Sequence, residues 1–411
     1  MMTSGPGTVS SVSAIGRISD GVLRGTRTTR DPRLHDRISF RHVCNTQSPK
    51  LRLNGICAYY AMFPLSFPYR RLRTAKGCSW VLDPFCGRGT TNVAARLLGL
   101  PSVGIDSSPV ATAIASAKLC DVSPSRVIDE CHRLLLEEKT PAHVPAGEFW
   151  ELCFHPQTLE EICRVREPLL DDCRSGTRKV LRALILGFLH GPVRKGLPSY
   201  LSNQMPRTYA TKPLSAVRFW RRHHLSPARV PLLELVKRRA GFYLSYRLPK
   251  PLGRIHQRDS RKELPRAYDQ RFDCVITSPP YLGMNHYLRD QWLRSWFLGG
   301  PDKPSGGQVA QITSEDEQTF VSDLAKAWSA VAKACAPGAR MTIRFGSIPS
   351  RNMDPRAVIC TSLQRASGRW KILTITDAGP SSRGKRQSDQ FSPTPGEPIN
   401  EIDVHAILEE N

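Results

Sequence analysis

Residues 81–106 read VLDPFCGRGTTNVAARLLGLPSVGID, and their pattern predicts a strand, a glycine turn, a helix and a second strand. The first apolar run ends at Asp83. The turn after it carries Gly87 and Gly89, which let a ligand lie against bare backbone and a helix N-terminus. Asp106 ends the second run, where a carboxylate can accept hydrogen bonds from both hydroxyls of a ribose. Because the turn matches neither GxGxxG nor a P-loop, a nucleoside site is predicted, with a phosphate-binding turn as the competing interpretation.

A second informative stretch, DCVITSPPYLGMNHYLRDQW, covers residues 273–292. An apolar strand runs directly into Ser278, Pro279, Pro280 and Tyr281. Proline fixes its own φ and lacks an N–H, so this tetrapeptide is a stiff, extended row of acceptors beside an aromatic ring. Such a row suits a flat group with an exocyclic amine, which offers two N–H donors. A plain turn at the end of the strand is the alternative.

Strand and helix patterns alternate through much of the chain. Helical patterns at residues 89–99 and 109–119 follow the first two strands, and a third at 317–338 precedes a later strand. This alternation predicts an α/β fold with a mainly parallel sheet, closed by an antiparallel pair because loop residues separate the last two strands. The strand candidates lie at residues 80–85, 102–106, 273–278, 340–347, 371–377 and 401–408.

The 411 residues carry a formal net charge of +23, which favours a polyanionic partner, although a solvated basic surface is the alternative. Residues 121–250 interrupt the alternation and predict a mainly helical, basic insertion, within which Thr158 and Glu161 have the spacing of a capping box. Between 194 and 250 basic residues are opposed by Glu234 alone, with aromatic residues among them. Because basic groups neutralise phosphates and aromatic rings stack on bases, this mixture predicts nucleic-acid binding, although core aromatics and solvated arginines would give the same pattern. The arginines expected to bind nucleic acid are Arg207, Arg218, Arg221, Arg222, Arg238 and Arg239.

Other features bound the class of protein. The 12 cysteines show no C-x-x-C pair and no zinc spacing, so we expect reduced thiols, no metal site and a cytoplasmic location. No apolar run reaches the roughly 18 to 20 residues that a membrane helix needs, and the best, at residues 180–189, is expected to be a buried helix. Residues 1–35 are expected to form a disordered basic arm, with a transit peptide as a minor alternative.

The motifs DPFCGRGTT (83–91), GID (104–106) and TSPPY (277–281) together resemble those of the N4-cytosine and N6-adenine DNA methylases, which use S-adenosylmethionine. The resemblance implies a seven-stranded, Rossmann-like methyltransferase sheet formed by residues 36–120 and 251–411, with target recognition in 121–250. It also implies that residues 59–72 enclose the methionine end of the cofactor. Arg88 departs from the usual small residue, so the turn is expected to be less snug or Arg88 to point outward. The cofactor-binding residues implied are Asp83, Phe85, Gly87, Gly89, Asp106 and, facing the adenine amine, Asp259.

The same resemblance implies a mechanism. The Ser278 hydroxyl and the Pro279 carbonyl would bind both hydrogens of an amine on a base flipped from double-stranded DNA, Pro280 would stiffen the segment, and Tyr281 would stack on the base. Cytosine N4 is the expected target, because serine before the prolines resembles that branch. N6-adenine methylation, RNA guanine-N2 methylation and a non-catalytic nucleic-acid-binding relative are the alternatives. The resemblance allows a restriction endonuclease partner and leaves the oligomeric state open.

Overall fold

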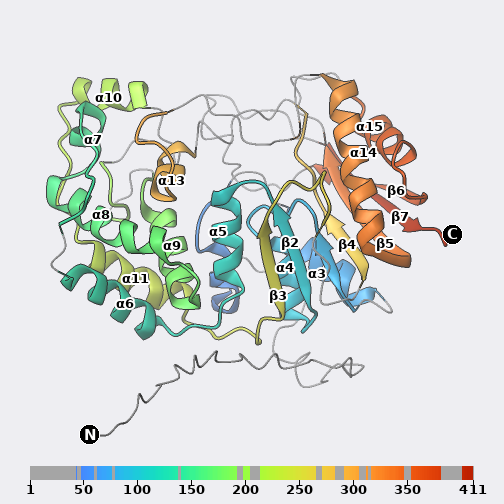
Figure 1. The fold of residues 1–411 in the computed structure, drawn as a ribbon, viewed down its shortest axis with the longest axis horizontal. Helices are drawn as coiled ribbons and strands as arrows, with labels where there is room; N and C mark the ends of the chain where they lie inside the picture. The colour runs from blue at the N-terminus through green and yellow to red at the C-terminus, as the bar shows by residue number, and fades with distance from the viewer. Residues whose placement is uncertain are drawn as a thin grey trace, which may run out of the picture.

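The computed structural model describes residues 43, 48–59, 63–75, 79–137, 140–191, 198–203, 213–264, 271–282, 291–304, 312, 316–346, 353–380 and 400–410. Its centre is a seven-stranded sheet in the order β3-β2-β1-β4-β5-β7-β6 (Figure 1). The strands are β1 (Val81–Asp83), β2 (Ser102–Asp106), β3 (Gly253–Gln257), β4 (Phe272–Thr277), β5 (Cys335–Gly346), β6 (Trp370–Pro380) and β7 (Asn400–Leu408).

The sheet is mainly parallel. Strands β3, β2, β1, β4 and β5 pair in parallel in that order, and β7 runs antiparallel between β5 and β6. The predicted α/β class, the seven-stranded Rossmann-like sheet and the antiparallel pairing of the last two strands are therefore confirmed. The carboxyl ends of β1, β2, β3, β4 and β5 meet at one edge, which is where open α/β sheets bind ligands.

Strand β3 was not among the strand candidates. Its sequence, GRIHQ, contains a single large aliphatic residue, and none of its five residues is buried. An edge strand of this kind lacks the apolar run or clean alternation on which a sequence prediction depends. Its pairing with β2 places residue 257 opposite Asp106, so the segment that carries Asp259 begins at the same edge of the sheet.

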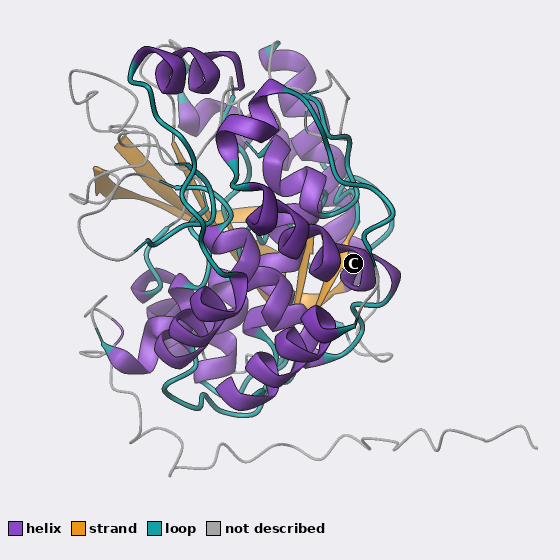
Figure 2. Ribbon diagram, turned by 90° about the vertical axis from the view of Figure 1, so that its left-hand side faces the viewer, coloured by secondary structure: helices purple, strands orange, loops and turns teal. Residues whose placement is uncertain are grey.

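Helices cover both faces of the sheet. One face packs against α3 (Ser66–Thr74), α4 (Thr90–Leu97) and α5 (Pro109–Lys118), and the other against α14 (Glu317–Ala334) and α15 (Pro355–Gln364). Side chains alternate across the sheet as strand geometry requires, since Val81 contributes to the first core and Leu82 to the second. Figure 2, turned by 90°, shows the orange strands among the purple helices.

A large group of helices lies beside α5 (Figure 1). Its members pack into the same core as α3, α4 and α5, and α9 contacts α5 directly. An aromatic cluster extends this core, with Trp150 4.6 Å from Trp296 and Phe149 5.0 Å from Trp292 between ring centroids. The group contains α6 (Pro124–Leu136), α7 (Glu148–Cys153), α8 (Pro156–Asp171), α9 (Gly176–Phe188), α10 (Pro213–Arg222) and α11 (Leu232–Tyr243), joined by α13 (Trp292–Phe297) and the 3-10 helix η1 (Pro49–Gly55).

The predicted capping box was wrong. Helix α8 begins at Pro156, with His155 as its N-cap, so Thr158 and Glu161 lie inside the helix. Both side chains bind a distant segment instead: the Thr158 hydroxyl donates to the Val230 carbonyl, at 3.0 Å, and Glu161 accepts from the Leu232 amide, at 2.8 Å. The two side chains that the local pattern predicted to cap the helix therefore make tertiary contacts instead.

The thiols follow the prediction with one exception. The other described cysteines are free and largely buried. Cys274 in β4 is disulfide-bonded, which corrects the expectation that all cysteines are reduced. None of the described helices is both long and apolar enough to cross a bilayer, and the segment at 180–189 lies in the buried helix α9 and its C-terminal end. Residues 1–35 lie outside the described residues.

Candidate active site

The glycine turn after β1 has the geometry that its sequence predicts. Gly87 has φ +48° and Gly89 has φ +77°, both in the left-handed region that favours glycine. A Cβ on Gly89 would lie 2.9 Å from the Cβ of Ala115, so a larger residue would force α4 and α5 apart. A Cβ on Gly87 would meet nothing within 4 Å, which shows open space beside this part of the turn.

Asp106 at the end of β2 holds the turn in place. One carboxylate oxygen accepts from the Gly87 amide, at 2.9 Å, and the other from the Ser108 amide, at 2.8 Å. Burial raises the pKa of Asp106 to about 6, although these two backbone N–H groups oppose the rise. The side chain expected to bind ribose hydroxyls therefore also shapes the turn on which a cofactor would lie.

Asp83 joins the two principal motifs. Its Oδ1 accepts from the Thr277 hydroxyl, at 2.7 Å, and from the Phe85 amide, at 3.1 Å. Thr277 ends β4, the parallel neighbour of β1, and immediately precedes Ser278. Burial raises the pKa of Asp83 to about 6, and its buried Oδ2 has no hydrogen-bond partner among the described residues. The glycine turn and the SPPY segment are thus fixed to each other.

The SPPY segment leaves two acceptors available. Pro279 is buried, and Ser278 and Pro280 are half-buried. Within the described ranges, neither the Ser278 hydroxyl nor the Pro279 carbonyl takes part in a hydrogen bond. Tyr281 is anchored at its far end, because its hydroxyl donates to Glu401, at 2.8 Å.

The segment around Asp259 also reaches this edge. The Arg258 amide donates to the Asp106 carbonyl, at 3.0 Å, and the Ser260 hydroxyl donates to the Pro84 carbonyl. Asp259 is engaged, since its carboxylate accepts from the backbone amide and guanidinium of Arg261, and these bonds outweigh burial and lower its pKa. Any contact from Asp259 to an adenine amine would have to share the carboxylate with Arg261.

Two residues of the turn differ from expectation or add to it. Arg88 does not point outward: it is 7% exposed and lies close to Cys57 and Tyr243. Phe85 packs edge-on to Trp328, with ring centroids 5.8 Å apart, which anchors the turn on the opposite core.

The sequence did not predict the roles of Thr277 and Glu401. Each acts through a partner far away in the chain, and no local spacing marks such a pair.

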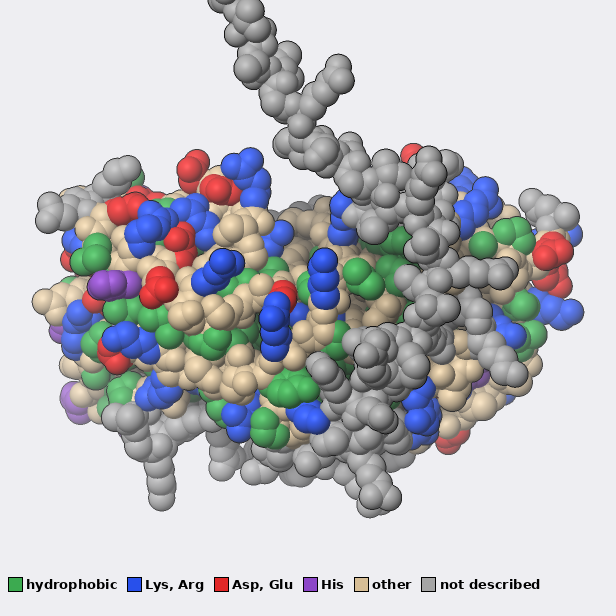
Figure 3. Space-filling view, turned by 90° about the horizontal axis from the view of Figure 1, so that it is seen from below, with side chains coloured by type: hydrophobic (Ala, Val, Ile, Leu, Met, Phe, Trp, Pro, Cys, Tyr) green, Lys and Arg blue, Asp and Glu red, His purple; other side chains and the backbone are tan. Residues whose placement is uncertain are grey.

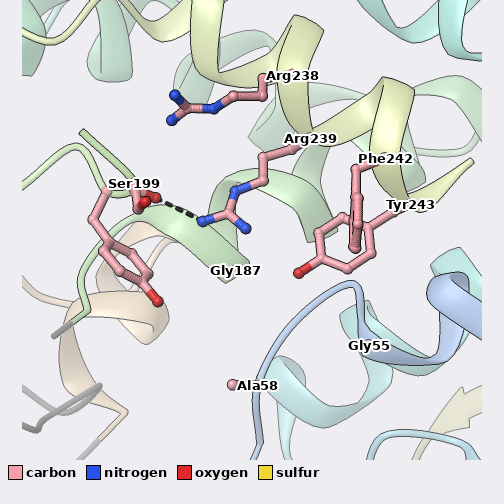
Figure 4. A pocket seen from close by; sticks show the side chains of 9 residues that line it. Gly55, Ala58, Gly187, Ser199, Arg238, Arg239, Phe242 and Tyr243 are labelled. Atoms are coloured by element: carbon pink, nitrogen blue, oxygen red, sulfur yellow. Dashed lines mark hydrogen bonds between the residues drawn. The ribbon is translucent and has the colours of Figure 1, made fainter. Parts of the chain in front are cut away.

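The basic residues of α10 and α11 divide into two groups. Arg218 and Arg222 are exposed and have no ionic or hydrogen-bond partner in the described parts of the chain, whereas Arg221 pairs with Glu148. Arg238 and Arg239 donate to the carbonyls of residues 198 and 199 and line a pocket of about 450 Å³ between α11, α9 and η1 (Figure 4). Arg207 lies outside the described residues.

The aromatic residues among these arginines are mostly structural. Trp220 is fully buried and Tyr200 is 3% exposed, so neither can stack on a base. Phe242 is 46% exposed, but the Arg52 guanidinium lies 4.4 Å from its ring centroid. Viewed from below, Lys and Arg side chains are scattered over the molecule and interspersed with acidic ones (Figure 3). Any nucleic-acid binding in this region would therefore depend on charge more than on stacking.

Comparison with known proteins gives a partial match to one family. A family model described as DNA methylase matches residues 40–117, which contain the glycine turn and Asp106. Over these residues the chain is similar to the N6/N4-type DNA methylases. Over 253 residues it is 24% identical to the type II methyltransferase M.BsoBI of Geobacillus stearothermophilus, a match that covers 54% of this chain and 48% of that protein. The chain thus spans about half the length of this curated relative.

Solved structures are less similar to this chain. The rRNA methyltransferase aviRa of Streptomyces viridochromogenes is 14% identical at a TM-score of 0.33, with 90% of this chain and 96% of that chain covered. A TehB-like SAM-dependent methyltransferase of Corynebacterium glutamicum is 10% identical at a TM-score of 0.31, with 84% and 87% covered. Similarity this low carries no argument, and the fold class rests on the sheet order itself.

The methylase family implies S-adenosylmethionine as the cofactor, and the residues present fit it. No described residue would lie within 4 Å of a Cβ on Gly87, which leaves bare backbone for a ligand, and the Oδ2 of Asp83, buried at the same edge, has no hydrogen-bond partner among the described residues. Asp106 ends the neighbouring strand, where a ribose would lie, and the Tyr59 hydroxyl reaches Ser108, at 3.4 Å, which brings the start of segment 59–72 to the site. These donors and acceptors suit a nucleoside that also carries a charged amino-acid group.

Proposed function

We propose that the protein transfers a methyl group from S-adenosylmethionine to the exocyclic amine of a base flipped out of double-stranded DNA, with cytosine N4 as the target. The observation that carries this proposal is the Asp83–Thr277 hydrogen bond of 2.7 Å. It fixes the acceptors of Ser278 and Pro279 relative to the turn shaped by Asp106. Methyl transfer to an amine needs this fixed arrangement of acceptors and glycine turn, because the amine and the methyl donor must be held in line.

The two acceptors address the main difficulty of amine methylation. The lone pair of an exocyclic amine is delocalised into the ring, which makes the nitrogen planar and a poor nucleophile. The Ser278 oxygen and the Pro279 carbonyl would each accept one N–H, favouring the pyramidal geometry in which the lone pair points at the methyl group. Bound S-adenosylmethionine would supply that methyl group from a positively charged sulfur: the S–CH₃ bond would break as the N–CH₃ bond forms, S-adenosylhomocysteine would leave as a neutral thioether, and one amine proton would be released to solvent. Because the amine hydrogens become more acidic as the nitrogen reacts, both hydrogen bonds strengthen in the transition state.

The cysteine nearest the site supports amine methylation over methylation of a ring carbon. Methylation at C5 of cytosine needs a thiolate nucleophile, and thiolate formation requires a low pKa. Burial raises the pKa of Cys86 well above its ordinary value, and nearby Asp106 and Asp83 raise it further. The Cys86 thiol also donates to the Gly87 carbonyl, at 3.7 Å, so its role is in packing the turn.

The choice of DNA is supported by the DNA methylase description of the matching family and by the basic residues of α10 and α11. Cytosine N4 is supported by Ser278 at the position before the prolines, with adenine N6 as the second candidate. Residues 121–250 would contact the target, and a cytoplasmic location would give access to DNA. RNA guanine-N2 methylation and a non-catalytic binding role are the outcomes against which the proposal is tested. A restriction endonuclease partner and the oligomeric state remain predictions for experiment.

The experiment is tritium transfer from labelled S-adenosylmethionine to unmethylated genomic DNA, followed by chromatography of the nucleosides. Label on N4-methylcytosine is the expected result, and label on C5, on RNA alone or nowhere would contradict the proposal. Ser278→Ala should lower kcat about 10²-fold, as loss of other transition-state hydrogen bonds does, while Kd for the cofactor stays near that of the wild type. Ser367→Ala, at an exposed position between α15 and β6, is the matched control and should retain full activity.

A further inference from the structure

The hydroxyl of Tyr281 is held by a residue from the last strand of the sheet. Tyr281 follows β4 by four residues, and its hydroxyl donates to Oε1 of Glu401, at 2.8 Å. Because β7 is antiparallel, its beginning lies at the carboxyl edge of the parallel strands, where Glu401 pairs with Gly346. The chain's C-terminal strand thereby reaches the segment proposed to grip the base.

Glu401 is itself held by a partly buried charge network. Its Oε2 lies 3.9 Å from Nε of Arg344, and the side chains of Glu401 and Arg344 are 13% and 12% exposed. Arg344 makes a two-point contact with Asp403, at 2.8 and 2.9 Å, and its guanidinium carbon lies 3.7 Å from the ring centroid of Phe67. Bidentate contacts of this kind fix geometry as well as charge. The acceptor for Tyr281 therefore stands in a fixed place.

The ring of Tyr281 has a second anchor. It packs edge-on against Phe345, with centroids 5.3 Å apart and planes at 84°. Phe345 is fully buried and stacks on Phe320, with centroids 6.2 Å apart. The hydroxyl contact with Glu401 fixes the direction of the ring's long axis, and the edge contact with Phe345 limits rotation of the ring about its Cβ–Cγ bond. Two anchors thus define the plane of the ring.

We infer that Glu401 is a positioning residue, which orients the Tyr281 ring so that its face meets the flipped base. This inference rests on the function proposed above. Stacking depends on the relative orientation of two planes, so a ring fixed before substrate arrives avoids the entropic cost of ordering it then. Because the hydroxyl is bound to Glu401, Tyr281 contributes through its ring and not as a proton donor to substrate.

The test is a double-mutant cycle on methyl transfer with labelled S-adenosylmethionine and unmethylated genomic DNA. Tyr281→Phe and Glu401→Ala should each lower kcat about ten-fold, the value for loss of one hydrogen bond to a charged acceptor. The double variant should be no worse than either single variant, because both remove the same contact. Glu401→Gln keeps an acceptor oxygen and should recover most of the activity. Glu409→Ala, near the far end of the same strand, is the matched control.

Cofactor Kd and melting temperature separate positioning from stability. A purely structural Glu401 would lower the melting temperature and leave kcat per folded molecule unchanged, and that result would overturn the inference. Additive losses in the cycle, or full activity of Tyr281→Phe, would overturn it too while leaving the proposed function standing. A wild-type protein that transfers no label to DNA would instead remove the proposed function and the role of Glu401 with it.

Discussion

Replacing Asp106 with Asn should weaken S-adenosylmethionine binding by about 10² while the protein stays folded. The carboxylate accepts two backbone hydrogen bonds, from Gly87 at 2.9 Å and from Ser108 at 2.8 Å, and is placed to accept two more from a ribose. The amide of Asn has the same shape but only one acceptor oxygen. Its NH₂ group would face one of the two backbone N–H donors, of Gly87 or Ser108. Asn would therefore lose one ribose contact and weaken its hold on the glycine turn.

The magnitude follows from the number of contacts. A hydrogen bond to a charged group contributes about 1.5 to 3 kcal/mol, and a neutral one about 1 kcal/mol. Losing one charged contact and reducing a second to a neutral one costs about 3 kcal/mol, which is about 10² in Kd. Asp106→Ala should cost more, because it also releases the Gly87 amide that shapes the turn.

Isothermal titration calorimetry with S-adenosylmethionine measures this loss directly. Asp273→Asn is the matched control, because Asp273 also accepts backbone hydrogen bonds, from Ser79 at 2.9 Å and Trp80 at 3.0 Å, but it lies near the start of β4, at the opposite edge of the sheet. It should lose thermal stability and keep its cofactor affinity. Equal affinities for Asp106→Asn and the wild type would refute the assignment of the ribose site.

Two further predictions concern pH and salt. Because the pKa of Asp106 is raised to about 6, cofactor affinity should fall as pH drops through 6, by up to about ten-fold per pH unit. A cofactor affinity that stays constant from pH 8 to 5 would argue against a carboxylate acceptor. The same pKa shift has the opposite effect on folding stability. Because the pKa of this carboxyl is higher in the folded protein than in the unfolded chain, it contributes stability below about pH 4, and that stability is lost as pH rises through 6. Thermal melts across this pH range measure the loss. Arg218→Ser/Arg222→Ser should reduce the slope of log Kd for DNA against log salt by about two. Charge-matched Arg365→Ser/Arg369→Ser, at exposed positions outside 121–250, should leave the slope unchanged, and equal slopes in all three proteins would move the DNA footprint elsewhere.

The sequence predicted the parts of the fold that local patterns specify. Apolar runs ending at Asp83, Asp106 and Thr277 became the strands at the centre of the sheet, because a buried parallel strand must be apolar on both faces. Gly87 and Gly89 were recognisable because no other residue adopts their backbone conformation without strain. The edge strand β3 carries neither signal and was missed.

Side-chain partners were the part that the sequence could not supply. Thr158 had the spacing of a cap but binds Val230, 72 positions away, and the aromatic residues read as stacking platforms include the fully buried Trp220. Tyr281 was identified as a site candidate, but nothing in its neighbourhood points to Glu401, 120 positions along the chain. Contacts of this range are decided by the packing of the sheet, which places chain segments together regardless of their separation.

The shared core beneath the helical group has a consequence for engineering. Helix α5 packs against α9, and its apolar residues, among them Val110, Ile114 and Ala117, are fully covered. Excising residues 121–250 would leave this apolar surface in water, so a truncated catalytic fragment is expected to aggregate. For the same reason the segment cannot be exchanged between relatives as an independent cassette. If α10 and α11 contact the target as proposed, new sequence preferences would have to be sought by substituting exposed positions on these helices while their inward faces are kept.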